Sequence, residues 1–280
     1  MIRIITDSAA DFEPAELKKL NIYCIPLSVQ IGEAVYHENV DLSKAQFYTL
    51  LAQSGALPKT SQPALQTVLD VYEEAKASGD QVVHITLSSA ISGTYQSALS
   101  VRNMAEFENC YIVDSRNATG GQRMLVEYAV KLRDAGRTAE EIVEAVEGLR
   151  DRVVLYACMD TLEYLYLGGR ISHTVYKLGS MAQIKPIIRV DEQGGIEVPA
   201  KAMGMRKGMD ILCKKPELLP PDPDFPIYVM YTGDRSNGEK LAQKLTSLGY
   251  PIPDSQIINV GAAIGSHVGP GACGIVYITK

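Results

Sequence analysis

The chain of 280 residues has no run of basic residues. Its 27 Lys and Arg residues are outnumbered by 33 Asp and Glu residues, which gives a formal net charge of −6 at pH 7. Proteins that bind nucleic acid or an anionic membrane surface concentrate positive charge on one face, because neutralising phosphates supplies much of their binding free energy. We therefore expect no nucleic-acid partner.

The sequence also lacks a long apolar run. Asp7 interrupts the apolar residues at the N-terminus before a signal-peptide core of ordinary length could form. No later stretch reaches the roughly 20 apolar residues that a helix needs to cross a bilayer. The absence of both features predicts a cytoplasmic protein with no integral membrane segment.

Cysteines are few, and their spacing is not that of a metal site. The five cysteines are Cys24, Cys110, Cys158, Cys213 and Cys273. Their number is odd and most of them lie within apolar runs, which favours reduced thiols in the core over disulfides or zinc ligands. We expect no bound metal.

What the sequence does contain is an ordinary globular composition, with 46 % apolar and 21 % charged residues. Its first half alternates short β-branched runs with longer amphipathic segments, a pattern typical of a parallel sheet with crossover helices. The clearest strands are residues 2–5, 82–87 and 111–113, and the expected helices are residues 14–20, 64–78, 95–105, 122–135 and 139–150.

The second half has strands in a less regular order, expected at residues 153–158, 187–190, 196–200, 227–231 and 274–278. Residues 191–195 have the composition of a hairpin turn, and the Pro-rich residues 216–226 indicate a surface connection without regular structure. The sequence thus predicts an α/β fold, with an N-terminal parallel, Rossmann-like sheet and a C-terminal α/β domain that has a mixed sheet. We place the domains at residues 1–151 and 152–280.

Small polar residues follow three of the predicted parallel strands. They are Thr6-Asp7-Ser8, the segment from Ser88 to Thr94, and Asp114-Ser115. Ligands of parallel sheets bind where strands end and helices begin, because helix N-termini present free N–H groups there. Any one of these segments could simply cap the following helix. Three together favour a ring of hydroxyl groups around a small anionic headgroup.

Other segments also carry groups suited to an anion. They are the turn at residues 59–63 with Thr60 and Ser61, the glycine pair before Arg170, and the glycine-dense residues 261–271, expected to form a loop that holds His267. Each has an ordinary alternative, namely a helix cap, a solvated arginine after a helix end, or a packed histidine.

Several motifs follow one another in a specific order along nearly the whole chain. They are Thr6-Asp7-Ser8, Lys59-Thr60-Ser61-Gln62-Pro63, residues 87–98, Val113-Asp114-Ser115, Gly168-Gly169-Arg170-Ile171-Ser172, Lys185-Pro186 and residues 265–271. In this order they resemble the DegV family of bacterial fatty-acid-binding proteins. The resemblance implies two α/β domains that hold one long-chain fatty acid, such as palmitate, in the cleft between them. It implies no other cofactor.

The resemblance also implies roles for individual residues. The expected ligand set is Thr60, Ser61, Ser92, Gly93, Thr94, Arg170 and His267. Thr60 and Ser92 would bond the carboxylate, with the acyl chain in an apolar tunnel, and no residue is given a catalytic role. Some relatives present the acid to a separate fatty-acid kinase, and Arg206 is the residue here that would contact such a partner.

This chain departs from the family pattern at three places. Ala64 stands where many relatives have a serine, and Arg206 and Lys207 stand where kinase-linked relatives have a larger basic cluster. Arg116 and Arg123 lie where relatives often have small residues. We expect that edge of the site to differ.

Two other function classes stay open on the residues alone. Hydroxyl groups and glycines would equally suit a binding module for another small anion, such as a sugar phosphate. A Ser-dependent hydrolase is the enzymatic alternative, although the sequence has no Gly-x-Ser-x-Gly elbow, Walker loop or zinc signature.

Overall fold

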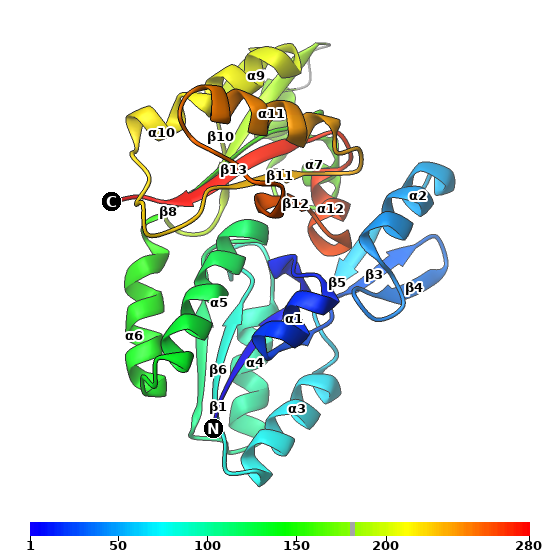
Figure 1. The fold of residues 1–280 in the computed structure, drawn as a ribbon. Helices are drawn as coiled ribbons and strands as arrows, with labels where there is room; N and C mark the ends of the chain where they lie inside the picture. The colour runs from blue at the N-terminus through cyan, green and yellow to red at the C-terminus, as the bar shows by residue number, and fades with distance from the viewer. Residues whose placement is uncertain (180–182) are drawn as a thin grey trace.

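A computed structural model describes residues 1–179 and 183–280, and it contains a four-stranded parallel sheet in the N-terminal part (Figure 1). Its strands, in spatial order, are β2 (Ile22–Ile25), β1 (Ile2–Asp7), β6 (Gln81–Thr86) and β7 (Cys110–Asp114). Every pair in this sheet is parallel. The predicted parallel sheet is therefore confirmed, and β2 is a strand that the sequence pattern does not predict.

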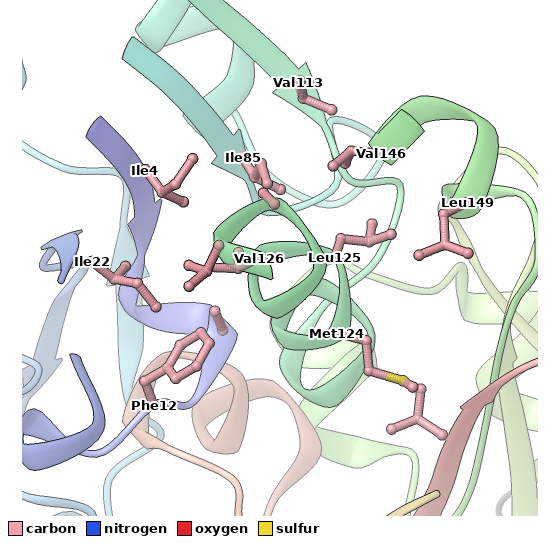
Figure 2. Packing of buried hydrophobic residues seen from close by; sticks show 14 of the residues in the cluster. Ile4, Phe12, Ile22, Ile85, Val113, Met124, Leu125, Val126, Val146 and Leu149 are labelled. Carbon is pink, nitrogen blue, oxygen red and sulfur yellow. The ribbon is translucent and has the colours of Figure 1, made fainter. Parts of the chain in front are cut away.

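Helices cover both faces of this sheet. They are α1 (Pro14–Leu20), α3 (Leu65–Ala77), α4 (Thr94–Met104), α5 (Thr119–Asp134) and α6 (Ala139–Arg150). The start of α6 is fixed by a capping box, in which the Thr138 side chain accepts from Glu141 N and the Glu141 side chain accepts from Thr138 N. Figure 2 shows Leu125 and Val126 of α5 packed near Ile85 and Ile4 of the sheet.

A mixed six-stranded sheet forms the C-terminal part. Its strands, in spatial order, are β10 (Ile196–Met203), β9 (Ile184–Val190), β8 (Val153–Cys158), β13 (Cys273–Ile278), β11 (Tyr228–Tyr231) and β12 (Ile257–Asn259). Only the β11–β12 pair is parallel. The predicted mixed sheet is confirmed.

The two faces of this second sheet have different neighbours. Helices α9 (Gly204–Cys213) and α11 (Ser236–Ser247) lie on the outer face (Figure 1). Their Met209 and Leu241 share a core with Val229 of β11. On the inner face, Met230 and Val276 share a core with α5 of the N-terminal part. The inner face of the second sheet and the N-terminal part therefore enclose a common interior.

The domain boundary between residues 151 and 152 stays a prediction. It falls between α6, which packs on the first sheet, and β8, which opens the second. The segment expected to lack regular structure begins with a short helix, α10 (Lys215–Leu218). That expectation was wrong at this point because Pro216 lies in the first turn, where its missing N–H breaks no helical hydrogen bond.

A third, antiparallel sheet with one helix projects beside these two parts (Figure 1). Its order is β4 (Ala34–His37), β3 (Ser28–Ile31) and β5 (Lys59–Ser61), and α2 (Lys44–Ser54) packs against it. The sequence predicts a turn at Thr60. That expectation was wrong, because Thr60 pairs with Val29 in the ladder between β5 and β3.

The remaining elements are short. They are η1 (Ser8–Ala10), α7 (Glu163–Leu167), α8 (His173–Gly179), η2 (Asp254–Gln256) and α12 (Ala262–Val268). The glycine-dense residues 261–271 were expected to form a loop, and α12 corrects this expectation. A Cβ added at Gly265 would lie 2.7 Å from Tyr48 Oη and 2.8 Å from Phe47 Cε1, so the glycine lets α12 pack closely on α2.

All five cysteines are free, and Cys24 is the one that is only partly buried. This agrees with the reduced core thiols expected from the sequence. Across residues 1–179 and 183–280, no helix has both the length and the apolarity to cross a bilayer.

Candidate ligand-binding site

A cavity of about 230 Å³ lies between the second sheet and the N-terminal part. Most of its wall is apolar, with contributions from both halves of the chain. The apolar lining residues are Leu27, Leu87, Ile91, Ala118, Leu155, Ala157, Leu165, Ile188, Val190, Ile196, Met230, Val260, Ala263, Ile264, Val268 and Ala272. The cavity is larger than the roughly 150 Å³ that accepts a benzene-sized guest in an apolar protein interior. It is therefore suited to an extended apolar group.

Polar groups gather at one part of the wall. They come from Thr60, Ser61, Gln62, Ser92, Gly93, Arg170 and His267. Thr60 Oγ1 lies 2.7 Å from His267 Nε2, and Arg170 Nε donates to Ile91 O at 3.0 Å. A Cβ added at Gly93 would lie 2.7 Å from Gln62 Oε1. We call this set the polar end of the cavity.

His267 stands in the last turn of α12 and is packed tightly against α7. A Cβ added at Gly168 would collide with the imidazole, so only glycine fits there. Burial, and to a lesser extent the charge of Arg170, lower the pKa of His267 to about 4. The ring is therefore neutral at pH 7. Its Nδ1 is buried and has no hydrogen-bond partner among the described residues.

Arg170 supplies positive charge at the polar end. Its guanidinium donates to the carbonyls of Ile91 and Gly168, the latter at 2.6 Å, and burial lowers its pKa. Among the residues that the structure describes, no carboxylate forms an ion pair with it. A partly buried cation without a counter-ion is a favourable place for an anion, because pairing offsets part of the cost of desolvation.

Ser92, Gly93 and Thr94 form the start of α4. Ser92 Oγ lies 2.9 Å from Thr94 Oγ1 and accepts from Thr94 N at 3.3 Å. Ser92 and Gly93 line the cavity, whereas Thr94 is buried and lies outside the lining. Six of the seven expected ligand residues thus reach the wall, and Thr94 supports Ser92.

The other arginines considered in the sequence lie away from the cavity lining. Arg206 is exposed on α9, which covers the outer face of the second sheet. Arg123 is buried between Glu127, at 2.9 Å, and Glu16, with its guanidinium 4.5 Å from the centre of the Phe12 ring. These contacts make Arg123 a link in the core rather than an edge of the site.

Arg116 follows β7, and its guanidinium lies 3.5 Å from Asp151. Its backbone lies close to Gly194 in the β9–β10 hairpin, where an added Cβ would be 2.9 Å from Arg116 Cα. Arg116 therefore contributes to the contact between the two halves of the chain and does not line the cavity.

Of the strand-end segments that suggest a ring of hydroxyl groups, residues 91–93 line the cavity and the others lie away from it. Thr6, Asp7, Ser8, Ser88 and Ser115 are buried, and none of them lines the cavity. Their side chains bond to the backbone of neighbouring loops and strands, as in the 2.7 Å bond from Leu87 N to the Asp7 carboxylate. The ordinary alternative, local capping and bracing, holds for these residues.

Several polar lining residues have no separate role in the sequence-based prediction. They are Gln62, Thr119, Tyr231 and Thr232. Gln62 stood within a quoted motif, so its position beside Thr60 was the available signal. The others lie at strand or helix ends of the second half and the start of α5, where nothing in the spacing marks them. Among the described residues, no cluster of His, Cys, Asp and Glu could hold a metal ion.

Comparison with known proteins gives consistent results. Residues 1–280 match the model of a family described as "Uncharacterised protein, DegV family". A DegV domain-containing protein of Halalkalibacterium halodurans is 34 % identical, with 100 % of this chain and 99 % of the relative covered. Protein DegV of Bacillus subtilis is 32 % identical over the same shares.

Two solved structures have the same fold. A DegV family protein from Thermus thermophilus, described for its fatty acid binding, has a TM-score of 0.90 at 28 % identity. DegV from Bacillus subtilis, described as a fatty acid binding protein, has a TM-score of 0.83 at 29 % identity. Each alignment covers 100 % of this chain and 99 % of the other.

Proposed function

This chain belongs to the DegV family, and we propose that it binds one long-chain fatty acid, with the carboxylate at the polar end of the cavity and the acyl chain along its apolar wall. The observation that carries this proposal is Arg170, a partly buried cation that has no counter-ion among the described residues and lines a largely apolar cavity. The fatty-acid-binding relatives from Thermus thermophilus and Bacillus subtilis support the same ligand class.

Thr60, Ser92 and Arg170 are the proposed direct partners of the carboxylate, with Ser61 and Gly93 shaping the cradle. Thr94 acts through Ser92, and His267 through its 2.7 Å contact with Thr60. In this arrangement, the neutral His267 adds no charge of its own. The acid would therefore be held by hydroxyl groups and one arginine.

The two parts of the ligand contribute differently to affinity. Each buried methylene contributes about 0.8 kcal/mol, so about fourteen of them contribute roughly 11 kcal/mol before the costs of association. Each hydrogen bond to a charged group contributes about 1.5–3 kcal/mol. The acyl chain therefore dominates affinity, and the polar end selects the headgroup and fixes its position.

We propose a carrier rather than an enzyme. Thr60 and His267 are within hydrogen-bond distance, as a nucleophile and its base would be. A pKa of about 4 makes His267 a weak base, however, and no described carboxylate bonds Nδ1 to orient the ring. These features support binding over hydrolysis.

A separate kinase that phosphorylates the bound carboxylate completes the proposal. A carboxylate held without a tight bidentate arginine keeps its oxygens reactive toward a phosphoryl donor. Arg206 is exposed on α9 and is our candidate contact for that kinase, which would work in the cytoplasm. An Arg206→Ala variant that still binds fatty acid should be phosphorylated more slowly by a fatty-acid kinase, and equal rates would remove Arg206 from the interface.

Native mass spectrometry of the purified protein tests the proposed function. We expect one bound fatty acid, identified after organic extraction, and replacement by added palmitate. A sugar phosphate in excess should not displace it. Recovery of empty protein that also ignores palmitate would rule out the carrier function, whereas displacement by the sugar phosphate would favour the small-anion alternative.

A further inference from the structure

Two carboxylates from the N-terminal part hold the first turn of α12. Asp11 Oδ1 accepts from Gly261 N at 2.8 Å, and Glu38 Oε1 accepts from Ala262 N and, at 3.3 Å, from Ala263 N. A Cβ added at Gly261 would collide with Glu38 and lie 2.9 Å from Asp11 Oδ1. Both side chains therefore converge on one helix end.

This pair of acids is buried, and not all of its carboxylate oxygens accept a hydrogen bond. Asp11 and Glu38 are each 1 % exposed, and each has one oxygen without a hydrogen-bond partner among the described residues, Asp11 Oδ2 and Glu38 Oε2. Two full negative charges in such a place repel each other, and a single proton on the pair relieves the repulsion.

The charged and titratable groups around the pair come from several elements. On α2, Lys44 donates to Asp11 O and pairs with Glu13, each at 2.8 Å, and Tyr48 donates to Val260 O at 2.9 Å. The other surrounding groups are Asp7 and Ser8 near η1, Cys24 on β2, and Thr119 and Arg123 on α5. Lys44 and Arg123 are the cations of this set, and both pair directly with other carboxylates.

Burial, and next the charge of Asp11, raise the pKa of Glu38 to about 7. Burial also raises the pKa of Asp11, while Lys44 opposes this change. An acid whose pKa is raised in the folded protein keeps its proton at a pH where the same acid in a looser state has lost it. The proton is then released as the pH rises through about 7.

The small third sheet and α2 contact α12 along its whole length. Glu38, which follows β4, bonds the first turn, and Tyr48 and Phe47 of α2 pack on Gly265 in the middle. Thr60 of β5 contacts His267 in the last turn. The position of His267 in the polar end therefore depends on how firmly the first turn is held.

We infer that Glu38 and Asp11 are positioning residues for the polar end, and that a proton held by this pair keeps α12 in place so that the cavity retains its ligand. When the proton leaves, repulsion between the two carboxylates loosens the first turn and displaces His267 from Thr60. The inference rests on the proposed fatty-acid binding for its ligand. It adds a release of the acid as pH rises through neutrality.

Glu38→Gln tests this directly, because the amide oxygen can still accept from Ala262 and Ala263 while the charge is gone. The dissociation constant for palmitate is measured at pH 6, 7 and 8.5 for the wild type, Glu38→Gln and a control, Glu33→Gln, which changes an exposed acid on the neighbouring hairpin turn. The titration of palmitate itself is common to all three proteins and cancels in their ratios.

The wild type should lose affinity relative to Glu38→Gln by about tenfold or more between pH 6 and 8.5, since one linked proton gives up to tenfold per pH unit. Glu33→Gln should follow the wild type. A ratio of wild type to Glu38→Gln that stays constant over this range overturns the inference. Should Glu38→Gln fail to fold, Asp11→Asn takes its place in the same series.

A second readout needs no ligand. The imidazole NMR signals of His267, assigned with His267→Gln, should shift between pH 6 and 8.5 in the wild type and stay fixed in Glu38→Gln. The ring itself, with a pKa of about 4, does not titrate there. Unchanged wild-type signals overturn the inference. If the His267 signals change with the titration of Glu38 but the protein does not bind palmitate, the positioning role is supported and the proposed function is refuted.

Discussion

The hydroxyl groups at the ends of the first sheet and those at the polar end of the cavity have the same chemistry but different surroundings. Thr6 donates to Ile85 O at 2.9 Å and Ser88 donates to Gly194 O at 2.9 Å, and both residues are fully buried. Thr60 and Ser92 are half-buried on the wall of a cavity. Clustering of hydroxyl groups in the sequence therefore does not by itself identify a binding site.

The charged groups of the two regions differ in the same way. The Asp7 carboxylate accepts hydrogen bonds from Leu87 N, Ala9 N and Gln122 Nε2. Arg170 donates only to backbone carbonyls and has no described carboxylate beside it. The Asp7 carboxylate thus has its hydrogen-bond partners within the fold, whereas the charge of Arg170 is not paired with a described carboxylate and is available to a ligand. This difference leads to opposite predictions for stability and for binding.

The largest expected effect is on stability, in the region of the strand ends. Asp7→Ala should lower the free energy of unfolding by about 3 kcal/mol, because three buried donors lose their acceptor. Chemical denaturation measures this change. The preference of the folded variant for palmitate over its methyl ester should equal that of the wild type, and a lost preference would place Asp7 in the binding site.

The next effect is on binding, at the polar end. Thr60→Ala combined with Ser92→Ala should weaken palmitate binding by about 2 kcal/mol, roughly 30-fold, because hydrogen bonds to the carboxylate are lost. Binding of the methyl ester should change little. Ser100→Ala removes an exposed hydroxyl group from α4 and serves as the matched control. Unchanged discrimination in the double variant would show that the carboxylate lies elsewhere.

The apolar wall can be tested without any mutation. Myristate has two methylenes fewer than palmitate and should bind about 1.6 kcal/mol more weakly, or about 15-fold. The same ratio should appear for the Thr60→Ala and Ser92→Ala double variant, because the wall and the polar end act separately. Titration calorimetry with both acids gives the ratio of the two dissociation constants. Equal affinities for the two acids would contradict contact between the apolar wall and the whole acyl chain.

The smallest expected change is in the stability of a variant at the strand ends. Ser88→Ala removes the bond to Gly194 O and should cost about 1 kcal/mol of stability, with palmitate affinity unchanged. Thermal unfolding and a single binding titration are sufficient. A binding defect larger than the stability defect would mean that the contact with the β9–β10 hairpin helps to close the cavity.

Much of the fold could be predicted because its signals are local. Periodicity placed the helices of the N-terminal part to within a few residues, and compact apolar runs identified β1, β6 and β7. The third sheet was missed because β5 has only three residues and is held by pairing with β3, about thirty residues earlier. The glycine-dense segment became α12 because Gly265 packs on α2, a contact that no local pattern reveals.

The site was less predictable than the fold. The family resemblance indicated Thr60, Ser92, Arg170 and His267, and the structure places all four on the cavity wall. Residue patterns alone favour all three strand ends, but of those segments residues 91–93 reach the wall, because sequence does not show which polar groups are already satisfied. Glu38 and Asp11 gave no signal, since their burial at the end of α12 depends on contacts between distant parts of the chain.

The most direct test of the division between the polar end and the apolar wall is a crystal structure with 16-bromohexadecanoic acid, whose bromine is located by anomalous scattering. We expect a carboxylate beside Arg170, Thr60 and Ser92, and one bromine peak among the apolar lining residues. A bromine peak beside Arg170, with the carboxylate elsewhere, would contradict this division.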